Sequence, residues 1–190
     1  MWQVAALMCV AVFFFRAFQR RKALSERMVS GPMLGFHWND PLEAVAKWAK
    51  QIGLKYVAAN QETACVSYVG HFPGVLPKVS YNFFLPRGRL DSIAAMIEDA
   101  SGYTFGSLSE AFGQKYGEAW DDGEEDSRTW IAGDLLLVLL QGASGYLHVR
   151  YLNMNNLAEG SDLEEEHDKI LTGLRAFDAA FREQQAAATK

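Results

Sequence analysis

The sequence predicts an α+β domain, an antiparallel sheet of hairpins packed against two or three helices, with a membrane-anchor helix before it. Three observations carry this prediction. An alternating apolar stretch with a tight turn occupies 78–97, and a second hairpin pattern occupies 135–154. Helix patterns with capping residues cover 40–52 and 104–116, and another opens at Ser161.

The anchor prediction rests on an apolar run from Trp2 to Phe15 that is followed at once by the basic cluster 16–22. A helix that reaches Phe18 rises roughly 27 Å, close to the ~30 Å of a bilayer core. Because the charge follows the apolar run and no small-residue cleavage site is present, we expect an uncleaved single-pass anchor through residues 2–18. The positive-inside rule then places the folded domain in the cytoplasm, with the extracytoplasmic side as the alternative.

The domain opens with a helix over 40–52, for which Asp40 is the predicted N-cap and Pro41 the first helical residue. Gly53 ends this helix pattern. Two strand patterns follow, at 54–59 and 63–70.

The clearest strand runs from Lys78 to Leu85, where apolar and polar residues alternate. Pro86 to Arg89 supplies the turn chemistry of a hairpin. Residues 90–97 fit either a helix or a strand, and the turn favours the strand. We expect the next helix, capped by Thr104 and ended by Gly117, to lie on the apolar face of this hairpin.

In the second half, strands are predicted at 128–133, 135–141 and 146–154, and the unbroken apolar run of the second indicates that both its faces are covered. Ser161 and Glu164 form a capping box at the start of the last helix. We divide the chain into the anchor and its basic flank, a connector, one α+β domain and a frayed tail: 1–22, 23–32, 33–182 and 183–190.

The segment F-H-W-N-D-P-L-E-A-V from Phe36, the strand before F-F-L-P-R-G-R-L and the helix end L-S-E-A-F-G-Q-K-Y-G loosely resemble small bacterial α+β binding domains. The similar families are the β-lactamase-inhibitor-like proteins and the outer-membrane assembly lipoproteins. The resemblance covers residues 33–154 at most, and it implies a non-enzymatic domain that binds another protein. The chain departs from those families because it lacks a lipoprotein cysteine.

The charge distribution limits which classes of partner the protein is expected to bind. The formal net charge of −5 combines +4 within residues 1–30 with −9 in the remainder. An acidic body without a basic stripe argues against nucleic-acid binding, which depends on Lys and Arg. An acidic surface suits a basic protein partner, and it also describes an ordinary solvated surface. Cys65 is the single cysteine of the body, which favours a reducing compartment.

No set of residues predicts catalysis, a cofactor or a metal site. The four histidines, His37, His71, His148 and His167, show no metal-ligand spacing. Cys65 falls inside a strand pattern, which predicts packing rather than nucleophilic chemistry. An enzyme with an unfamiliar site would be indicated by a pocket that collects a histidine and two carboxylates.

The sequence therefore predicts a membrane-tethered, non-catalytic protein-binding domain of the inhibitor, immunity or assembly-factor type. The alternatives are a structural subunit of a membrane complex and, third, an enzyme. Partner-binding residues are expected in the loop after strand 63–70 and along an edge that leads from aromatic to acidic residues: His71, Phe72, Tyr103, Phe105, Trp120, Asp121, Asp122, Glu124 and Glu125.

Overall fold

The computed structural model describes residues 35–71, 78–97, 103–120, 123–157 and 162–188. The chain divides into two compact units, residues 1–37 and residues 38–190, and the fold described below is that of the second. The predicted anchor and connector lie outside the described residues. Within the described ranges, no helix has the length and apolar character needed to cross a membrane.

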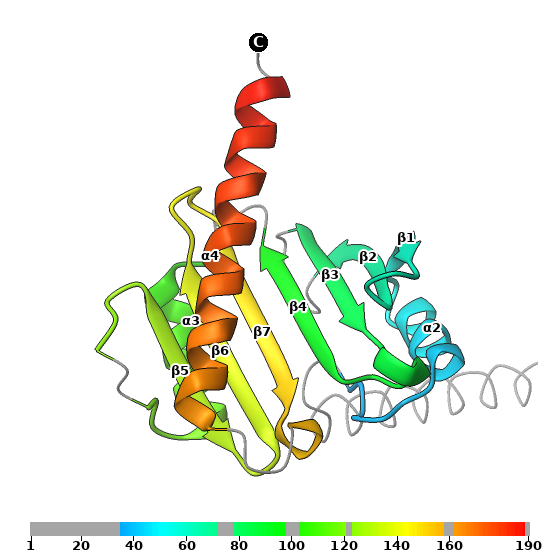
Figure 1. The fold of residues 1–190 in the computed structure, drawn as a ribbon, viewed down its shortest axis with the longest axis horizontal. Helices are drawn as coiled ribbons and strands as arrows, with labels where there is room; N and C mark the ends of the chain where they lie inside the picture. The colour runs from blue at the N-terminus through cyan, green and yellow to red at the C-terminus, as the bar shows by residue number, and fades with distance from the viewer. Residues whose placement is uncertain (1–34, 72–77, 98–102, 121–122, 158–161, 189–190) are drawn as a thin grey trace, which may run out of the picture. The chain divides into compact units, whose positions relative to one another are not determined.

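One seven-stranded sheet forms the centre of the unit (Figure 1). All neighbouring strands are antiparallel. In spatial order the strands are β1 (Lys55–Asn60), β2 (Cys65–His71), β3 (Lys78–Phe84), β4 (Ser92–Ile97), β7 (Leu147–Asn153), β6 (Leu135–Gln141) and β5 (Ser127–Ala132). The predicted α+β class with an antiparallel sheet of hairpins is confirmed.

The turn between β3 and β4 decides how residues 90–97 fold. A 3-10 turn over Pro86–Gly88 places Arg87 and Gly88 at φ of 59° and 74°, which reverses the chain direction. Tyr81 then pairs with Ala95 in the β3–β4 ladder. The strand prediction for this segment is confirmed.

The sheet has two faces. Every second residue of β3, including Tyr81 and Phe83, points to the face that carries α3 (Phe105–Tyr116), here called the α3 face. Phe112 of α3 packs edge-on against Trp130 of β5 at 5.4 Å and against Tyr151 of β7 at 6.4 Å between ring centroids. This helix therefore lies mainly over β5 and β6. Its predicted position on the β3–β4 hairpin was wrong, because its aromatic anchor fits against Trp130.

The start of α2 (Leu42–Gln51) also differs from the prediction. Pro41 occupies the N-cap position, with no side-chain capping bond, in place of Asp40. The reason lies in the chain just before the helix. The Asp40 carbonyl accepts a hydrogen bond from Leu90 N at 2.8 Å, and Pro41 forms a β-bridge with Arg89. Residues 40–41 are thus held in an extended conformation by the turn after β3.

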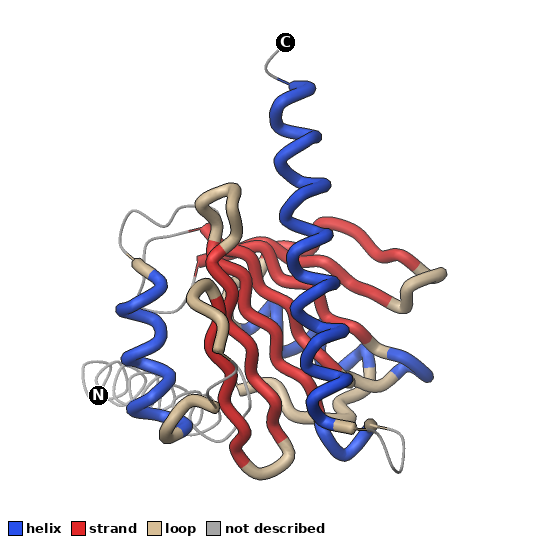
Figure 2. Tube along the Cα trace, turned by 60° about the vertical axis from the view of Figure 1, so that its left-hand side comes forward, coloured by secondary structure: helices blue, strands red, loops and turns tan. Residues whose placement is uncertain are grey.

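The opposite face, here called the α4 face, carries the long helix α4 (Leu163–Ala188) (Figures 1 and 2). At 1.5 Å per residue its 26 residues span about 39 Å, more than a seven-residue strand. The helix continues past Arg182, where the sequence places the end of the domain, and its last turns extend beyond the strands. Asp162 directly precedes the helix, and its side-chain oxygen accepts from Glu164 N at 2.9 Å, whereas Ser161 lies outside the described residues.

Candidate functional site

The α4 face is covered on one half only. Leu136, Val138 and Leu140 of β6 are at most 1% exposed and form a cluster with Leu171 of α4. The prediction that both faces of this strand are covered is confirmed, because the alternate leucines of β6 are buried as well. Apolar burial of this kind stabilises the docking of α4 by ~25 cal/mol per Å² removed from water.

The other half of the α4 face has no helix over it among the described residues (Figure 1). We call this surface the bare half-face, and its side chains are half-buried. They are mostly small or polar, unlike those of the leucine cluster, and come from β2, β3 and β4: Ser67, Val69, Asn82, Phe84 and Ala94. The Ser67 hydroxyl donates a hydrogen bond to the Asn82 side-chain oxygen at 2.6 Å.

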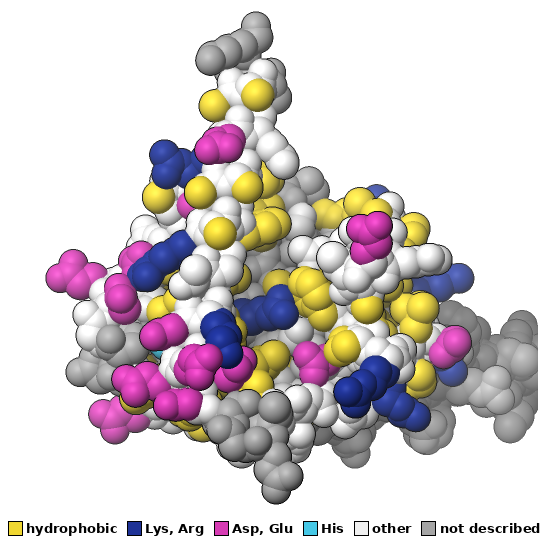
Figure 3. All heavy atoms as spheres, viewed as in Figure 1, with side chains coloured by type: hydrophobic (Ala, Val, Ile, Leu, Met, Phe, Trp, Pro, Cys, Tyr) yellow, Lys and Arg dark blue, Asp and Glu magenta, His cyan; other side chains and the backbone are white. Residues whose placement is uncertain are grey.

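A groove of about 550 Å³ runs between α4 and the bare half-face. One wall consists of α4 side chains, among them Ile170, Leu174 and Phe177, and the floor includes Met96 and Arg150. Hydrophobic and basic side chains meet in this hollow beside the helix (Figure 3). Its volume lies within the range of pockets that hold ligands or partner side chains.

Asp178 fixes the position of α4 at one end of this groove. Its carboxylate accepts hydrogen bonds from the Ser144 hydroxyl, from Ser144 N at 3.2 Å and from His148 Nε2 at 2.9 Å. The three residues link the turn before β7, β7 itself and α4, and Asp178 is only 3% exposed. Gly142 is required beside them, because a Cβ there would collide with the Asp178 carboxylate and lie 2.9 Å from His148 Nε2.

The same three residue types occur in hydrolase triads, but their arrangement differs. In a triad the histidine lies between the serine and the acid and takes the proton of the serine. Here Asp178 lies between Ser144 and His148, so the hydroxyl donates to the carboxylate and is not activated as a nucleophile. The cluster serves to hold α4.

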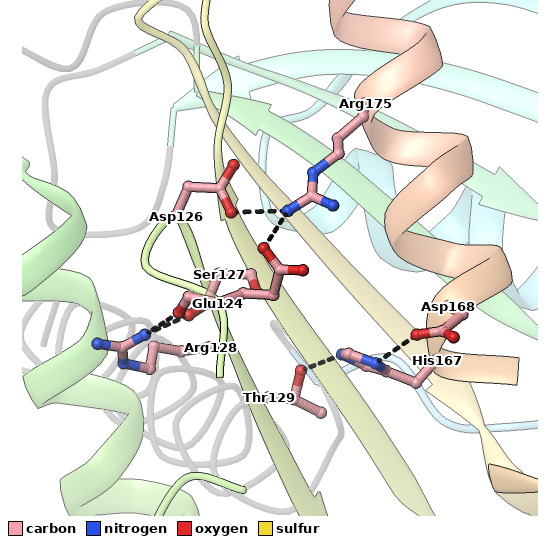
Figure 4. A network of polar contacts seen from close by, with 8 residues as sticks. All are labelled: Glu124, Asp126, Ser127, Arg128, Thr129, His167, Asp168 and Arg175. Atoms are coloured by element: carbon pink, nitrogen blue, oxygen red, sulfur yellow. Dashed lines mark hydrogen bonds and ion pairs between the residues drawn. The ribbon is translucent and has the colours of Figure 1, made fainter. Parts of the chain in front are cut away.

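Further contacts fix the first half of α4 (Figure 4). Thr129 of β5 and His167 of α4 are hydrogen-bonded at 2.9 Å, and both are buried. Arg175 donates to Glu124 at 2.9 Å and to Asp126 at 2.8 Å in the segment before β5. These ion pairs are exposed and contribute little stability each, but one of them engages Glu124, which is among the predicted partner-binding residues.

Arg150 is the charged residue in the floor of the groove. One of its nitrogens donates to Ser92 Oγ at 2.8 Å, and its Cζ atom lies 4.2 Å from the centroid of the Phe84 ring. Burial lowers the pKa of the guanidinium, while the negative charge of Asp91 raises it. Asp91 accepts from Asn156 at 2.8 Å, and within the described chain no carboxylate forms an ion pair with Arg150.

The groove also collects one histidine and two carboxylates, His148, Asp91 and Glu166. This is the combination named above as an indication of an enzyme. Each of the three already has a partner: His148 contacts Asp178, Asp91 accepts from Asn156, and Glu166 pairs with Lys169 at 2.8 Å. The described residues hold no group of three or more His, Cys, Asp or Glu side chains suited to a metal ion.

The residues predicted to bind a partner do not form one surface. Phe105 lies on the α3 face, under the Arg128 guanidinium at 5.6 Å, and with Tyr103 it lines a separate hollow of about 420 Å³. Trp120 instead packs edge-on against His167 on the α4 face, at 5.0 Å between ring centroids. The edge strand β5 therefore separates the aromatics, which were predicted to lie along one edge.

The remaining predicted residues divide between described and undescribed segments. His71 is the last residue of β2 and pairs with Lys78, and its side chain lies outside the described residues, as do Phe72, Asp121 and Asp122. Glu125 is exposed, and Glu124 binds Arg175. Acidic side chains gather at the end of α4 that lies next to the acidic segment before β5 (Figure 3).

Sequence reasoning missed Arg150, Gly173 and Asp178. Arg150 carried little signal, because it alternates with Val149 and Tyr151 inside a predicted strand, which is the ordinary pattern of a residue on the solvent face. Cys65, at the edge of the bare half-face, is half-buried, and burial raises the pKa of its thiol, which agrees with a packing role.

No protein-family model, curated protein or solved structure with which the chain was compared matches it.

The Asp178 contacts predict a pH-dependent stability. Burial raises the pKa of this carboxyl, but the hydrogen bonds from Ser144 and His148 outweigh burial and leave the pKa below its ordinary value. The stabilisation is therefore complete above about pH 4 and is lost as the pH falls through the lowered pKa. Asp178→Asn should reduce the free energy of unfolding at pH 7 by about 1–3 kcal/mol, measured by urea denaturation.

The difference between Asp178→Asn and the wild type should shrink as the pH falls below about 4. Glu183→Gln, at an exposed position on the same helix, is the control and should change the free energy by less than about 0.5 kcal/mol. Equal stability of wild type and Asp178→Asn at pH 7 would contradict the assigned role.

Proposed function

We propose that this protein is a non-catalytic binding domain that recognises another protein through the bare half-face and the groove beside α4. One observation carries the proposal. Ser67, Asn82, Phe84 and Ala94 remain half-buried on the same sheet face on which Leu136 and Val138 are completely buried. A sheet surface of this kind, with apolar groove walls next to polar groups, has the mixed chemistry of a protein interface.

The proposal includes a membrane tether. Residues 2–18 would hold the domain at the membrane, and the basic cluster that follows supports the cytoplasmic side, with the extracytoplasmic side as the alternative. Tethering raises the local concentration of a partner in the same membrane, so a modest interface suffices. Inhibitors, immunity proteins and assembly factors act in this way by occupying a surface of their target.

The contacts of α4 support a rigid binding surface. The helix that forms one groove wall is held by the Leu171 cluster, by Asp178 and by the Thr129–His167 hydrogen bond. A preorganised surface loses little side-chain and backbone freedom when a partner binds. The groove wall therefore needs no large rearrangement for recognition.

The acidic segment is a weaker candidate for the contact surface. Two of its carboxylates, those of Glu124 and Asp126, are engaged by Arg175. A basic partner would have to compete with that arginine. The bare half-face has no such internal competitor in the described chain.

Site-specific photocrosslinking in the native membrane tests the proposal. A benzophenone amino acid at Val69, on the bare half-face, should give a discrete protein adduct, while the same residue at Ala111, exposed on α3, should give at least tenfold less. Absence of an adduct at Val69, or equal adducts at both positions, would contradict the proposed surface.

Deletion of residues 1–22 should leave partner recovery largely intact. Loss of partner recovery would favour the alternative of a structural subunit whose main contacts come from the anchor.

A second candidate function is an enzyme, and the contact between Asp178 and His148 favours it. An aspartate at one ring nitrogen can orient an imidazole whose other nitrogen acts as a general base, and His148 borders the groove. Our account expects p-nitrophenyl butyrate hydrolysis by the full chain to be unchanged by His148→Gln. A loss of a hundredfold or more in a folded variant would support the enzyme instead.

A further inference from the structure

The guanidinium of Arg150 makes no ion pair within the described chain, although the charge of Asp91 acts on it from a greater distance. A single row of paired residues crosses the sheet through Asn82, Ala94, Arg150 and Val138, so the arginine stands at the border between the bare half-face and the part covered by α4. Within the described chain it has one hydrogen bond, to Ser92, and a stacking contact with Phe84.

A guanidinium carries five N–H donors, of which two can meet the oxygens of one carboxylate side by side. Partial burial of such a cation costs free energy unless an anion or several acceptors compensate it. Phe84 offsets part of this cost through its ring face, and the Ser92 hydroxyl offsets another part. Arg150 lines the groove, and the hydrogen bond to Ser92 uses one of its five N–H donors.

The side chains that line the groove beside Arg150 indicate the chemistry of the rest of the ligand. Met96, Ile170, Leu174 and Phe177 present apolar surface along the groove. The charged residues that also line it are paired elsewhere: Lys169 binds Glu165 and Glu166, and Asp91 accepts from Asn156. A group that enters the groove therefore meets Arg150, a cation without an ion pair in the described chain, next to apolar walls and the carboxylate of Asp91.

We infer that the groove takes a segment of the partner protein that carries a carboxylate next to apolar side chains, and that Arg150 pairs with this carboxylate. The inference rests on the proposed function and names the chemistry of the contact. Arg150 would determine specificity, because a neutral amide cannot accept two charge-assisted hydrogen bonds from the guanidinium.

Gly173 supports the inference independently. It lies in the middle of α4, where glycine costs roughly 1 kcal/mol of helix stability relative to alanine. Apart from the neighbouring residues and the backbone of the helix itself, no atom lies within 4 Å of the position that a Cβ would take, so packing inside the domain does not require a glycine. The residue lines the groove, and its missing side chain keeps the groove open.

Methyl NMR tests the inference on the full chain in phosphatidylcholine nanodiscs. The chain contains 6 methionines, and the Met96 methyl group lines the groove, whereas Met154 packs with the Leu171 cluster. The probes are 4-phenylbutyrate and its amide, which share an apolar body. The acid should shift the Met96 signal with a Kd at least tenfold lower than that of the amide, and Met154 should respond less.

Variants test the role of Arg150 and the role of the groove wall at Gly173 separately. Arg150→Gln should abolish the preference for the acid, and Arg150→Lys should retain only part of it because lysine lacks the planar fork. Gly173→Leu should weaken both probes at least tenfold by filling the groove, while Thr172→Leu, at the exposed preceding position of α4, should leave both unchanged. If an Arg150 variant fails to fold, the comparison of acid and amide on the wild type still tests the inference, and Gly173→Leu shows whether both probes bind in the groove.

Equal binding of acid and amide by the wild type, or an acid preference that survives Arg150→Gln, would overturn the inference. If that happens while the Val69 crosslink persists, the carboxylate contact is wrong and the protein-binding function stands. If the acid preference holds but Val69 gives no protein adduct, the protein partner is wrong, and with it the assignment of the carboxylate to a partner segment.

Discussion

The attachment of α4 to one half of a sheet face is the constraint on which the rest of this structure depends. Asp178 ties the helix to β7 and to the turn before it, and Leu171 anchors it on β6. Because these contacts all lie on the β5–β7 side, the helix forms the edge of a groove instead of a lid over the whole face. A helix shifted towards β4 would bury Ala94 and remove the groove.

Much of the fold could be predicted because its signals are local. Alternation along β3, the turn at Pro86–Gly88 and the Thr104 cap each act within a few residues, and the structure has all three. The sheet order could not be predicted, since Ala95 pairs with Val149 across more than fifty residues and no local pattern encodes that contact. The predicted position of α3 was wrong for the same reason.

The candidate site was harder to predict than the fold. Aromatic and acidic residues in loops suggested one edge, but the strand that separates Phe105 from Trp120 places them on opposite faces. The groove is built from residues that attract little attention in a sequence, such as Ala94 and Gly173. These residues line the groove because α4 leaves them uncovered, and that depends on where α4 docks.

The central claim is that the bare half-face is open in the isolated protein and is covered by a partner. The most direct test is the rate of maleimide labelling of Ala94→Cys in the full chain with Cys9 and Cys65 replaced by serine. The account predicts rapid labelling of the purified protein and at least tenfold slower labelling in the native membrane, where the partner is present. Slow labelling of the purified protein would contradict the account, because the surface would then be covered by the chain itself.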